Sequence, residues 1–273
     1  MNMLAIANQK GGVGKTTTTV TLAGLLASSG QRILLVDTDP QGSLTSYFGF
    51  EPEQLRYSVY SFFEESQSRI KLPVQQVVQK TRFDNIDLLP AVPAMATLDR
   101  QLINRPGMGL VLSQAISPLV RSYDRVLFDC APALGVLLIN ALGASRELVI
   151  PVQTEHLAIK GLERMLKTLA MVNRVRKQPL PYVVLPTFYD SKIWACVEAL
   201  QSLQQRHADR LAPKPVPFDP QLKEASRKNT PLSLLNSDAD SIDAYKALLT
   251  VLQRPEDLPA TRPTRISNNG QRQ

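Results

Sequence analysis

The sequence predicts an α/β protein with a doubly wound, mainly parallel sheet flanked by helices. Three observations favour this fold. Apolar runs of strand length alternate along the 273 residues with longer runs whose apolar residues recur at helical spacing. A glycine-rich turn joins the first apolar run to the first helical run. Two later apolar runs end in aspartate, at the strand ends where open α/β sheets bind their ligands.

The expected strands are short and apolar, and they span residues 3–7, 32–36, 86–89, 123–129, 148–152 and 182–185. The expected helices span residues 17–27, 57–65, 109–122, 157–174, 193–205, 222–227 and 241–252. Residues 74–80 fit either a helix or a strand, and residues 213–217 fit a stiff linker or an edge strand. Pro118 predicts a kink in the third helix or argues against that helix. Thr154 is the expected N-cap of the helix at 157–174, with Glu155 in its first turn.

The composition is that of an ordinary soluble domain, with 44% hydrophobic and 20% charged residues. We expect one domain over residues 1–254, followed by a disordered, Pro-rich polar tail at 255–273. No apolar run reaches about 18 residues, so no membrane helix is expected. The two cysteines, Cys130 and Cys196, form no C-x-x-C pattern, and the first residues lack the features of a signal peptide. These observations predict a cytoplasmic protein.

The formal net charge is +7, and its distribution is uneven. Residues 160–230 hold 13 Lys and Arg against 6 Asp and Glu, so this region accounts for the whole excess. Such a region is typical of a nucleic-acid-binding surface, but a solvated surface without a polyanion partner has the same composition.

The glycine-rich turn has the chemistry of a phosphate-binding loop. Its glycines let the backbone amides turn toward an anion, and the helix that follows adds the positive end of its dipole. Lys15 would contact the β- and γ-phosphates, and Thr16 would contribute a hydroxyl to Mg²⁺. The strict P-loop pattern requires glycine where Gln9 stands, so the match is incomplete. The predicted nucleotide-binding residues are Gly11, Gly12, Val13, Gly14, Lys15, Thr16 and Thr17.

Three carboxylates lie at the ends of two apolar runs. Asp37 and Asp129 end these runs, and Asp39 follows Asp37 by two residues. Asp37 and Asp129 are expected to reach a Mg²⁺ ion together with Thr16, the second of them as a Walker B aspartate. Asp39 would orient or polarise a water molecule near the γ-phosphate. The alternative for Asp37 and Asp39 is an ordinary turn built from Asp, Pro and Gly.

Four motifs together resemble the deviant Walker A ATPases of the ParA/MinD family. They are K-G-G-V-G-K-T-T at 10–17, D-T-D-P-Q at 37–41, F-D-C-A-P at 128–132 with Ala131 in place of a proline, and P-V-Q-T-E at 151–155. Members of the ParA branch read N-Q-K-G-G at the loop, which accounts for Gln9. The resemblance implies ATP and Mg²⁺ as cofactors, an ATP-dependent homodimer, and slow hydrolysis stimulated by an adaptor or partition-type protein. It also implies that Lys10 reaches the phosphates of the partner subunit's ATP. The implied catalytic residues are then Lys10, Lys15 and Asp39.

The resemblance favours the ParA (Soj-like) branch over MinD, because no apolar helix face follows Leu252. It implies binding of DNA without sequence preference. Lys192 stands near the position of a DNA-contacting arginine, whereas Gln221 replaces a second one. Lys223, Arg227 and Lys228 lie close enough in sequence to compensate.

One kind of cargo is favoured over a broader alternative. Residues 42–49 and 161–165 resemble the ParA-like ATPases of chemotaxis clusters, which position chemosensory arrays through an adaptor protein. The expected location of this protein is nucleoid-associated or polar. Chromosome or plasmid partition is the broader alternative. A MinD-like ATPase, or a metabolic P-loop enzyme such as a nitrogenase-reductase-like protein, remains a further alternative.

Overall fold

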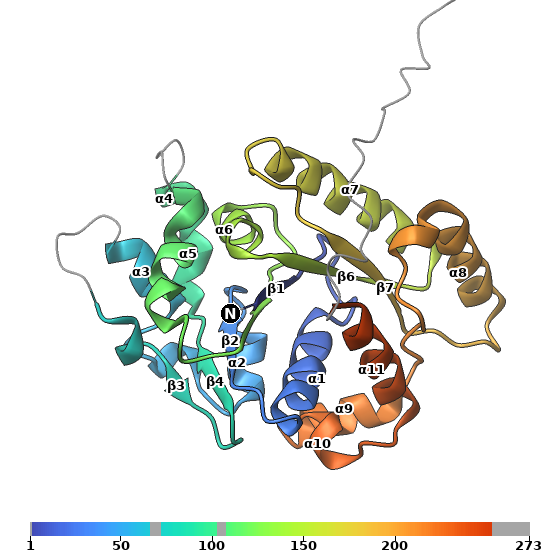
Figure 1. Ribbon diagram of the computed structural model, residues 1–273, viewed down its shortest axis with the longest axis horizontal. Coiled ribbons are helices and arrows are strands. Elements are labelled where there is room, and N and C mark those ends of the chain that lie inside the picture. The colour runs from blue at the N-terminus through green and yellow to red at the C-terminus, as the bar shows by residue number, and fades with distance from the viewer. Residues whose placement is uncertain (1, 66–71, 103–107, 253–273) are drawn as a thin grey trace, which may run out of the picture.

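The computed structural model describes residues 2–65, 72–102 and 108–252 (Figure 1). At its centre is a seven-stranded sheet in the order β3-β4-β2-β5-β1-β6-β7. Six strands run parallel, and β3 pairs antiparallel with β4 at one edge. The strands are β1 (Asn2–Ile6), β2 (Ile33–Asp37), β3 (Gln79–Lys80), β4 (Ile86–Leu89), β5 (Arg125–Asp129), β6 (Glu147–Gln153) and β7 (Tyr182–Thr187). The predicted doubly wound α/β fold is therefore confirmed.

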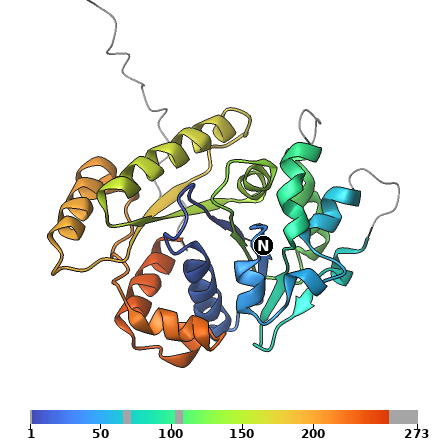
Figure 2. The same cartoon turned by 180° about the vertical axis from the view of Figure 1, so that it is seen from behind.

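Helices cover both faces of the sheet (Figures 1 and 2). One face carries α3 (Val59–Glu65), α4 (Leu98–Gln101), α5 (Val111–Ile116), α6 (Val136–Ala144), α7 (His156–Asn173) and α8 (Trp194–His207). The other carries α1 (Lys15–Ser28), α2 (Ser43–Tyr47), α9 (Pro220–Arg227), α10 (Leu232–Leu235) and α11 (Asp240–Leu252). Short 3₁₀ helices lie at Pro52–Gln54, Val74–Gln76, Pro93–Thr97, Met108–Leu110, Ser117–Leu119 and Ala208–Arg210.

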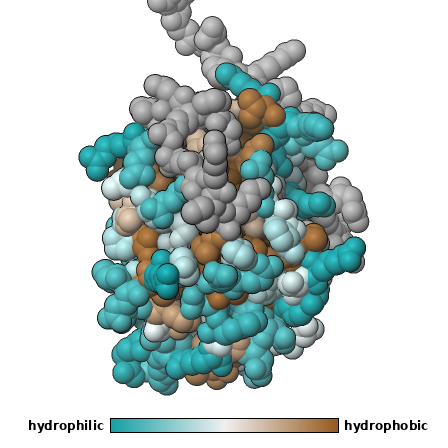
Figure 3. All heavy atoms as spheres, turned by 90° about the vertical axis from the view of Figure 1, so that its left-hand side faces the viewer, coloured by the Kyte–Doolittle hydropathy of each residue, from teal (hydrophilic) through white to brown (hydrophobic). Residues whose placement is uncertain are grey.

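Apart from the edge strand β3, the strands are largely buried on both faces, because alternate side chains enter two separate hydrophobic cores. In β2, Leu34 and Val36 join the core beneath α3, α5, α6 and α7. Ile33 and Leu35 join the core beneath α1, α2 and α11. The outer surface over the β3 side of the molecule is mostly hydrophilic, with small apolar areas between polar ones (Figure 3). Within the described residues, no helix is long and apolar enough to cross a membrane.

The central position of β1 determines where a ligand can bind. Its neighbours are β5 and β6, so the chain leaves β1 at the point where the strand order reverses. The register pairs Ile6 of β1 with Asp129 of β5, and Asp129 with Asp37 of β2. The loops after these three strands therefore meet at one edge of the sheet.

Most elements match the sequence prediction to within a few residues, and the differences have physical causes. Pro118 ends α5, which stops at Ile116 and continues as a 3₁₀ helix. Residues 74–80 form both a 3₁₀ turn and the edge strand β3. The helices α2, α4, α6 and α10 were not predicted. Residues 255–273, the predicted tail, lie outside the described part of the chain.

The prediction for the start of α7 is wrong. Glu155 occupies the N-cap position without a side-chain cap bond, and α7 begins at His156. The Thr154 hydroxyl instead donates to the carbonyl oxygens of Thr187 (3.3 Å) and Phe188 (3.2 Å). The hydroxyl therefore holds β6 against the end of β7, and the Glu155 carboxylate is left to make a different contact.

A close approach between α1 and α10 yields a stability prediction. A Cβ atom on Gly24 would lie 2.8 Å from Cβ of Pro231 and would also collide with the Ser233 hydroxyl. We expect Gly24→Ala to lower the free energy of unfolding by about 1–3 kcal/mol, although alanine is the better helix former. Urea denaturation measures this change. The exposed Ser28→Ala on the same helix is the control, expected to stay within about 0.5 kcal/mol; equal midpoints for both variants would contradict the prediction.

Candidate nucleotide-binding site

The turn between β1 and α1 has the backbone geometry of an anion cradle. Gly12 and Gly14 have positive φ angles of 72° and 87°, which the other amino acids adopt only with strain. No heavy atom lies within 4 Å of a Cβ built on Gly11 or Gly12, so their backbone is open to a ligand. Gly14 is the N-cap of α1, and glycine provides no side chain to satisfy the first amides of the helix. These amides and the helix dipole favour an anion at this position.

Two carboxylates end neighbouring strands beside this turn. Asp37 and Asp129 are paired in the sheet register, and they are 0% and 1% exposed. Burial, reinforced by the charge of Asp37, raises the pKa of Asp129 to about 8. Burial also raises the pKa of Asp37 to about 6, against the hydrogen bonds from Thr45. Both shifts mainly express the cost of burying a charged carboxylate away from water, a cost that a divalent cation offsets.

The predicted metal-site residues fit a hard cation. The Thr16 hydroxyl donates to Oδ2 of Asp129 at 2.6 Å, so the two groups already adjoin. Asp37 is held by three donors: the Thr45 amide (2.8 Å), the Thr45 hydroxyl (2.7 Å) and the Asp39 amide (3.0 Å). Hydroxyl and carboxylate oxygens are the ligands that Mg²⁺ prefers, usually with several waters retained. Thr16, Asp37 and Asp129 would hold it.

Lys15 reaches back across the loop. Its side chain is buried, and its Nζ donates to the carbonyl oxygen of Lys10 at 3.1 Å. Burial lowers the pKa of Lys15, and the nearby charges of Asp129 and Asp39 oppose the shift. The ammonium therefore lies close to Asp129, a predicted Mg²⁺ ligand, and to Asp39, which is predicted to orient the water. Asp39 itself is partly buried, and its Oδ1 accepts from the Gln41 amide at 3.0 Å.

Lys10 makes an intrachain contact that the sequence did not predict. Its Nζ forms an ion pair with the Glu155 carboxylate and lies 3.5 Å from Oε1 of Gln153. The Lys10 and Glu155 side chains are 28% and 41% exposed, so the pair lies at the surface of the site. Gly161 of α7 leaves room for the Lys10 stem, because a Cβ there would come within 3.3 Å of Cβ of Lys10.

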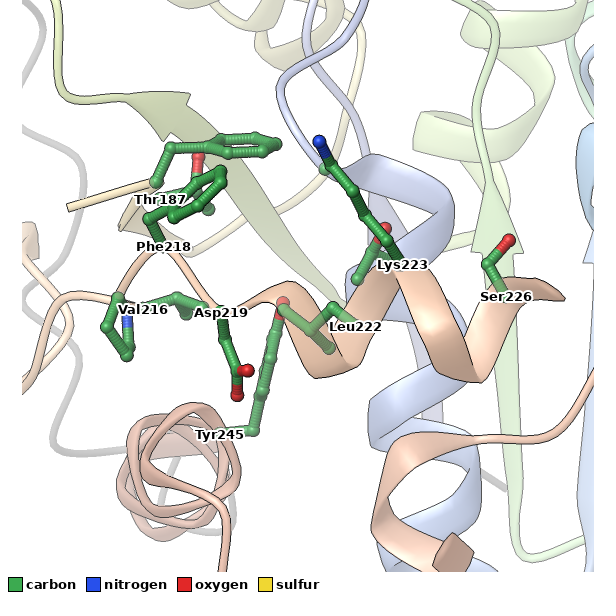
Figure 4. Close-up of a pocket in the computed structure, with 12 residues that line it drawn as sticks. Thr187, Val216, Phe218, Asp219, Leu222, Lys223, Ser226 and Tyr245 are labelled. Carbon is green, nitrogen blue, oxygen red and sulfur yellow. The ribbon is translucent and has the colours of Figure 1, made fainter. Parts of the chain in front are cut away.

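A pocket of about 220 Å³ adjoins the glycine-rich turn (Figure 4). Gly14 and Thr17 form its side toward the turn, and Tyr245 of α11 contributes to its wall. Phe188 lines it in a left-handed conformation with φ 57°, which is rare for a bulky residue and often marks a functional position. The further lining residues are Thr187, Val216, Pro217, Phe218, Asp219, Leu222, Lys223 and Ser226.

The predicted DNA-binding residues fall on two joined segments. Lys192 is exposed just before α8, and its amide donates to Oδ1 of Asp190 at 2.8 Å. Lys223 lies on α9 with its ammonium 5.6 Å from the ring centroid of Phe218. The Phe218 amide donates to the Tyr189 carbonyl at 2.8 Å, which ties the two segments together.

The other two cations are paired on the same helix. Arg227 and Lys228 lie 2.7 Å and 3.6 Å from Oε1 of Glu224, and the arginine depresses the pKa of that carboxyl to about 2. Gln221 accepts from the Asn236 side chain at 2.8 Å. The cations therefore share a region of the surface, but two of them face a carboxylate of their own helix.

Several residues of the site were missed by sequence reasoning. Thr45 follows Asp37 by eight residues, and Phe188 and Glu155 come from the far half of the chain. Phe188 follows an apolar run, as many unremarkable residues do, so it carries no local signal. Glu155 lay within the P-V-Q-T-E motif, which could have suggested a contact with the loop.

The comparisons with known proteins agree on one family. A family model described as an AAA domain matches residues 1–181. The sporulation initiation inhibitor protein Soj of Bacillus subtilis is 34% identical over 244 residues, covering 89% of this chain and 94% of Soj. The chromosome partitioning protein ParA of Myxococcus xanthus is 30% identical over 266 residues, covering 97% of this chain and 92% of that ParA.

A solved structure is similar along almost the whole chain. Cobyrinic acid a,c-diamide synthase from Mycobacterium smegmatis, with a bound ATP analogue and magnesium, has a TM-score of 0.80 at 30% identity and covers 96% of this chain and 100% of that one. With this fold, this loop geometry and these relatives, the chain belongs to the ParA/MinD family of P-loop ATPases.

Proposed function

We propose that this protein is a ParA-type ATP hydrolase that forms an ATP-dependent sandwich dimer, binds DNA without sequence preference and positions an intracellular cargo. The observation that carries the proposal is the constellation around the glycine-rich turn, with Lys15 and two buried carboxylates on one side and Lys10 at the surface on the other. The proposed unit is one domain over residues 1–254 with a tail at 255–273, located in the cytoplasm at the nucleoid or the pole.

The proposed nucleotide position follows from the site. The phosphates lie on the amides of residues 11–17, and the base enters the pocket beside Phe188 and Phe218. Thr16, Asp37 and Asp129 hold magnesium, which supplies charge neutralisation to the phosphates. The related synthase of M. smegmatis, solved with an ATP analogue and magnesium, supports these two cofactors.

In the proposed hydrolysis, Asp39 orients the attacking water, while Lys15 and the partner's copy of Lys10 stabilise the charge on the transferring phosphoryl group. The turnover is slow and is stimulated by an adaptor or partition-type protein.

The proposed dimer uses the face at the carboxyl ends of the strands. Leu134, in the loop after β5, and Leu157, in the first turn of α7, are 51% and 64% exposed at this end. Lys10 pairs with Glu155 of its own chain, so its role in trans requires that it exchange this carboxylate for a phosphate. A pair this exposed contributes little stability, because solvent screens it, and a triphosphate carries the larger charge.

DNA binding is proposed to rest on Lys192, Lys223, Arg227 and Lys228. The excess of basic residues in 160–230 supports a polyanion partner. A phosphate replaces Glu224 as the partner of Arg227 and Lys228 when DNA binds. The names of Soj and ParA favour chromosome or plasmid partition as the cargo function; the positioning of chemosensory arrays rests on the motifs at 42–49 and 161–165.

A second candidate function follows from the name of the M. smegmatis relative, which is a synthase. In that case ATP would activate a carboxylic acid substrate and DNA would have no effect. Cys130 and Cys196 are buried and free, which gives an iron–sulfur carrier no exposed thiol among the described residues. Comparing phosphate release with duplex DNA and with a corrinoid acid plus an amide donor separates the two functions.

Asp39→Ala tests the hydrolytic assignment. We expect phosphate release to fall by at least about 100-fold while ATP-analogue affinity changes less than about threefold, because a water-orienting group acts mainly in the transition state. Single-turnover phosphate release and a fluorescent-nucleotide titration measure the two quantities. Asp84→Ala, on an exposed loop, is the control. An Asp39→Ala protein that hydrolyses ATP at the wild-type rate would remove Asp39 from the mechanism.

Lys10→Ala tests the role in trans. The variant should bind ATP with nearly wild-type affinity but remain monomeric, because the cation that contacts the partner's phosphates is missing. Light scattering after size-exclusion chromatography, with ATP and Mg²⁺, gives the mass. Lys160→Ala removes an exposed lysine of α7 and should dimerise normally. A normal ATP-dependent dimer of Lys10→Ala would rule out this role.

Salt dependence tests the DNA assignment. The logarithm of the affinity of the ATP-bound protein for random duplex DNA should fall linearly with the logarithm of salt concentration, and Lys192→Ala should reduce the slope by about 1. Fluorescence anisotropy of labelled DNA measures both. Lys246→Ala, which removes an exposed lysine from α11, should leave the slope unchanged. If the ATP-bound wild type fails to bind DNA even at low salt, DNA binding is excluded.

A further inference from the structure

The loop after β2 ties α2 to a carboxylate of the nucleotide site. The amide and the hydroxyl of Thr45, on α2, both donate to the same oxygen of Asp37. The Thr45 hydroxyl also accepts from the Ala91 amide at 2.9 Å. Gly42, just before α2, has φ 63°, and a Cβ there would lie 2.7 Å from Cγ of Pro52. With so little freedom, α2 follows any change in the position of Asp37.

The last residue of α2 contacts a distant part of the chain. The Tyr47 hydroxyl donates to the carbonyl oxygen of Thr230 at 2.9 Å. Tyr47 is half-buried, and burial raises its pKa to about 12, so the hydroxyl stays a neutral donor at physiological pH. The contact spans 183 residues of sequence and joins the loop after β2 to the segment after α9.

Arg82, in the turn before β4, donates hydrogen bonds to the same segment. Its Nη2 donates to the carbonyl oxygens of Lys228 (2.9 Å) and Asn229 (2.8 Å) and to the Thr230 hydroxyl (2.9 Å). Phe83 packs edge-on against Phe48, the residue after Tyr47, with ring centroids 5.9 Å apart. Tyr47 and Arg82 therefore belong to one packed unit beside the nucleotide site.

The segment that Tyr47 and Arg82 contact, residues 228–230, is the C-terminal cap of α9. The amides of Lys228, Asn229 and Thr230 bond back to carbonyls of α9, and Asn229 adopts φ 51°. Because the amides point into the helix, the carbonyl oxygens of these residues are available to Tyr47 and Arg82. The end of α9 that carries Arg227 and Lys228 is thus fixed by groups outside the helix.

We propose that Tyr47 and Arg82 are positioning residues that connect the nucleotide site to the basic end of α9, so that nucleotide bound near Asp37 sets how firmly the DNA-facing cations are held. This inference rests on the proposed function and adds its regulation. A ligand shifts such an equilibrium only through a difference in its interactions with the two arrangements. Here the difference would arise at Asp37, because this carboxylate would hold the cation and already accepts two hydrogen bonds from Thr45 of α2.

The pocket gives nucleotide a second route to α9, because Lys223 and Ser226 line it. In Figure 4 the side chains of both rise from the same side of the helix. The test must therefore separate the cap at 228–230 from the middle of the helix. Amide hydrogen exchange with peptide resolution does so, and its readout depends neither on turnover nor on DNA.

The experiment compares exchange in the full chain without nucleotide and saturated with a non-hydrolysable ATP analogue and Mg²⁺. In the wild type we expect exchange at 228–230 to slow by about fivefold on saturation. Tyr47→Phe and Arg82→Gln should reduce this response to less than about twofold while the response of residues 220–225 persists. Tyr60→Phe is the matched control, because it removes a hydroxyl that contacts Gln101 at an exposed position.

Thermal unfolding of each variant first confirms that it folds. The inference is overturned if the cap of the saturated wild type does not respond, or if the response survives in both Tyr47→Phe and Arg82→Gln. Failure of the wild type to bind the analogue at all overturns the proposed function as well. If the DNA affinity of the wild type depends on nucleotide, Tyr47→Phe should reduce the ratio of the DNA affinities measured with ATP and with ADP. If the protein does not bind DNA, the exchange measurement alone decides whether nucleotide and the cap are coupled.

Discussion

The rest of this site depends on the burial of two neighbouring carboxylates. Asp37 and Asp129 end adjacent parallel strands in register, so the sheet itself brings their charges together. Each is held by a threonine from a different element, Asp129 by Thr16 of α1 and Asp37 by Thr45 of α2. Burial raises the pKa of both carboxyls, and the charge of Asp37 adds to the shift at Asp129. The arrangement is therefore poised for a cation, and the elements that touch these carboxylates are those that a bound cation affects.

The two lysines of the loop occupy contrasting environments. Lys15 is buried against the backbone of Lys10 and near Asp129, where its charge is committed to the site. Lys10 is more exposed and bonds to Glu155, a residue at the N-terminal end of α7. A lysine on a four-carbon stem can change partners at little cost when the existing pair is screened by water. The two lysines of one loop therefore differ in burial and in partner, which is the basis for proposing different roles for them.

The sequence predicted what depends on local pattern and on parallel topology. The carboxylates could be placed together because strands that run parallel end at the same edge, and the loop could be identified from its glycines. The Lys10–Glu155 pair could not, since it joins residues 145 positions apart through the packing of α7. Helix α6 was missed because its nine residues, V-L-L-I-N-A-L-G-A, are apolar almost throughout and show no polar face. Thr154 was assigned as an N-cap on its residue type alone, but β7 offers its hydroxyl carbonyl acceptors that no local rule reveals.

The two borders of the sheet differ from its interior. At one, β3 is two residues long, runs against its neighbour and ends in Lys80, whose ammonium is paired with Asp87. At the other, the segment around Leu211 and Pro217 forms isolated bridges to Val184 and Tyr189 beside β7. A sheet edge that is short, charged or covered by a proline-containing segment offers few unpaired backbone N–H and C=O groups with which a strand of another chain could pair. Both borders of the sheet therefore disfavour pairing with the sheet of another copy, even at high local protein concentration.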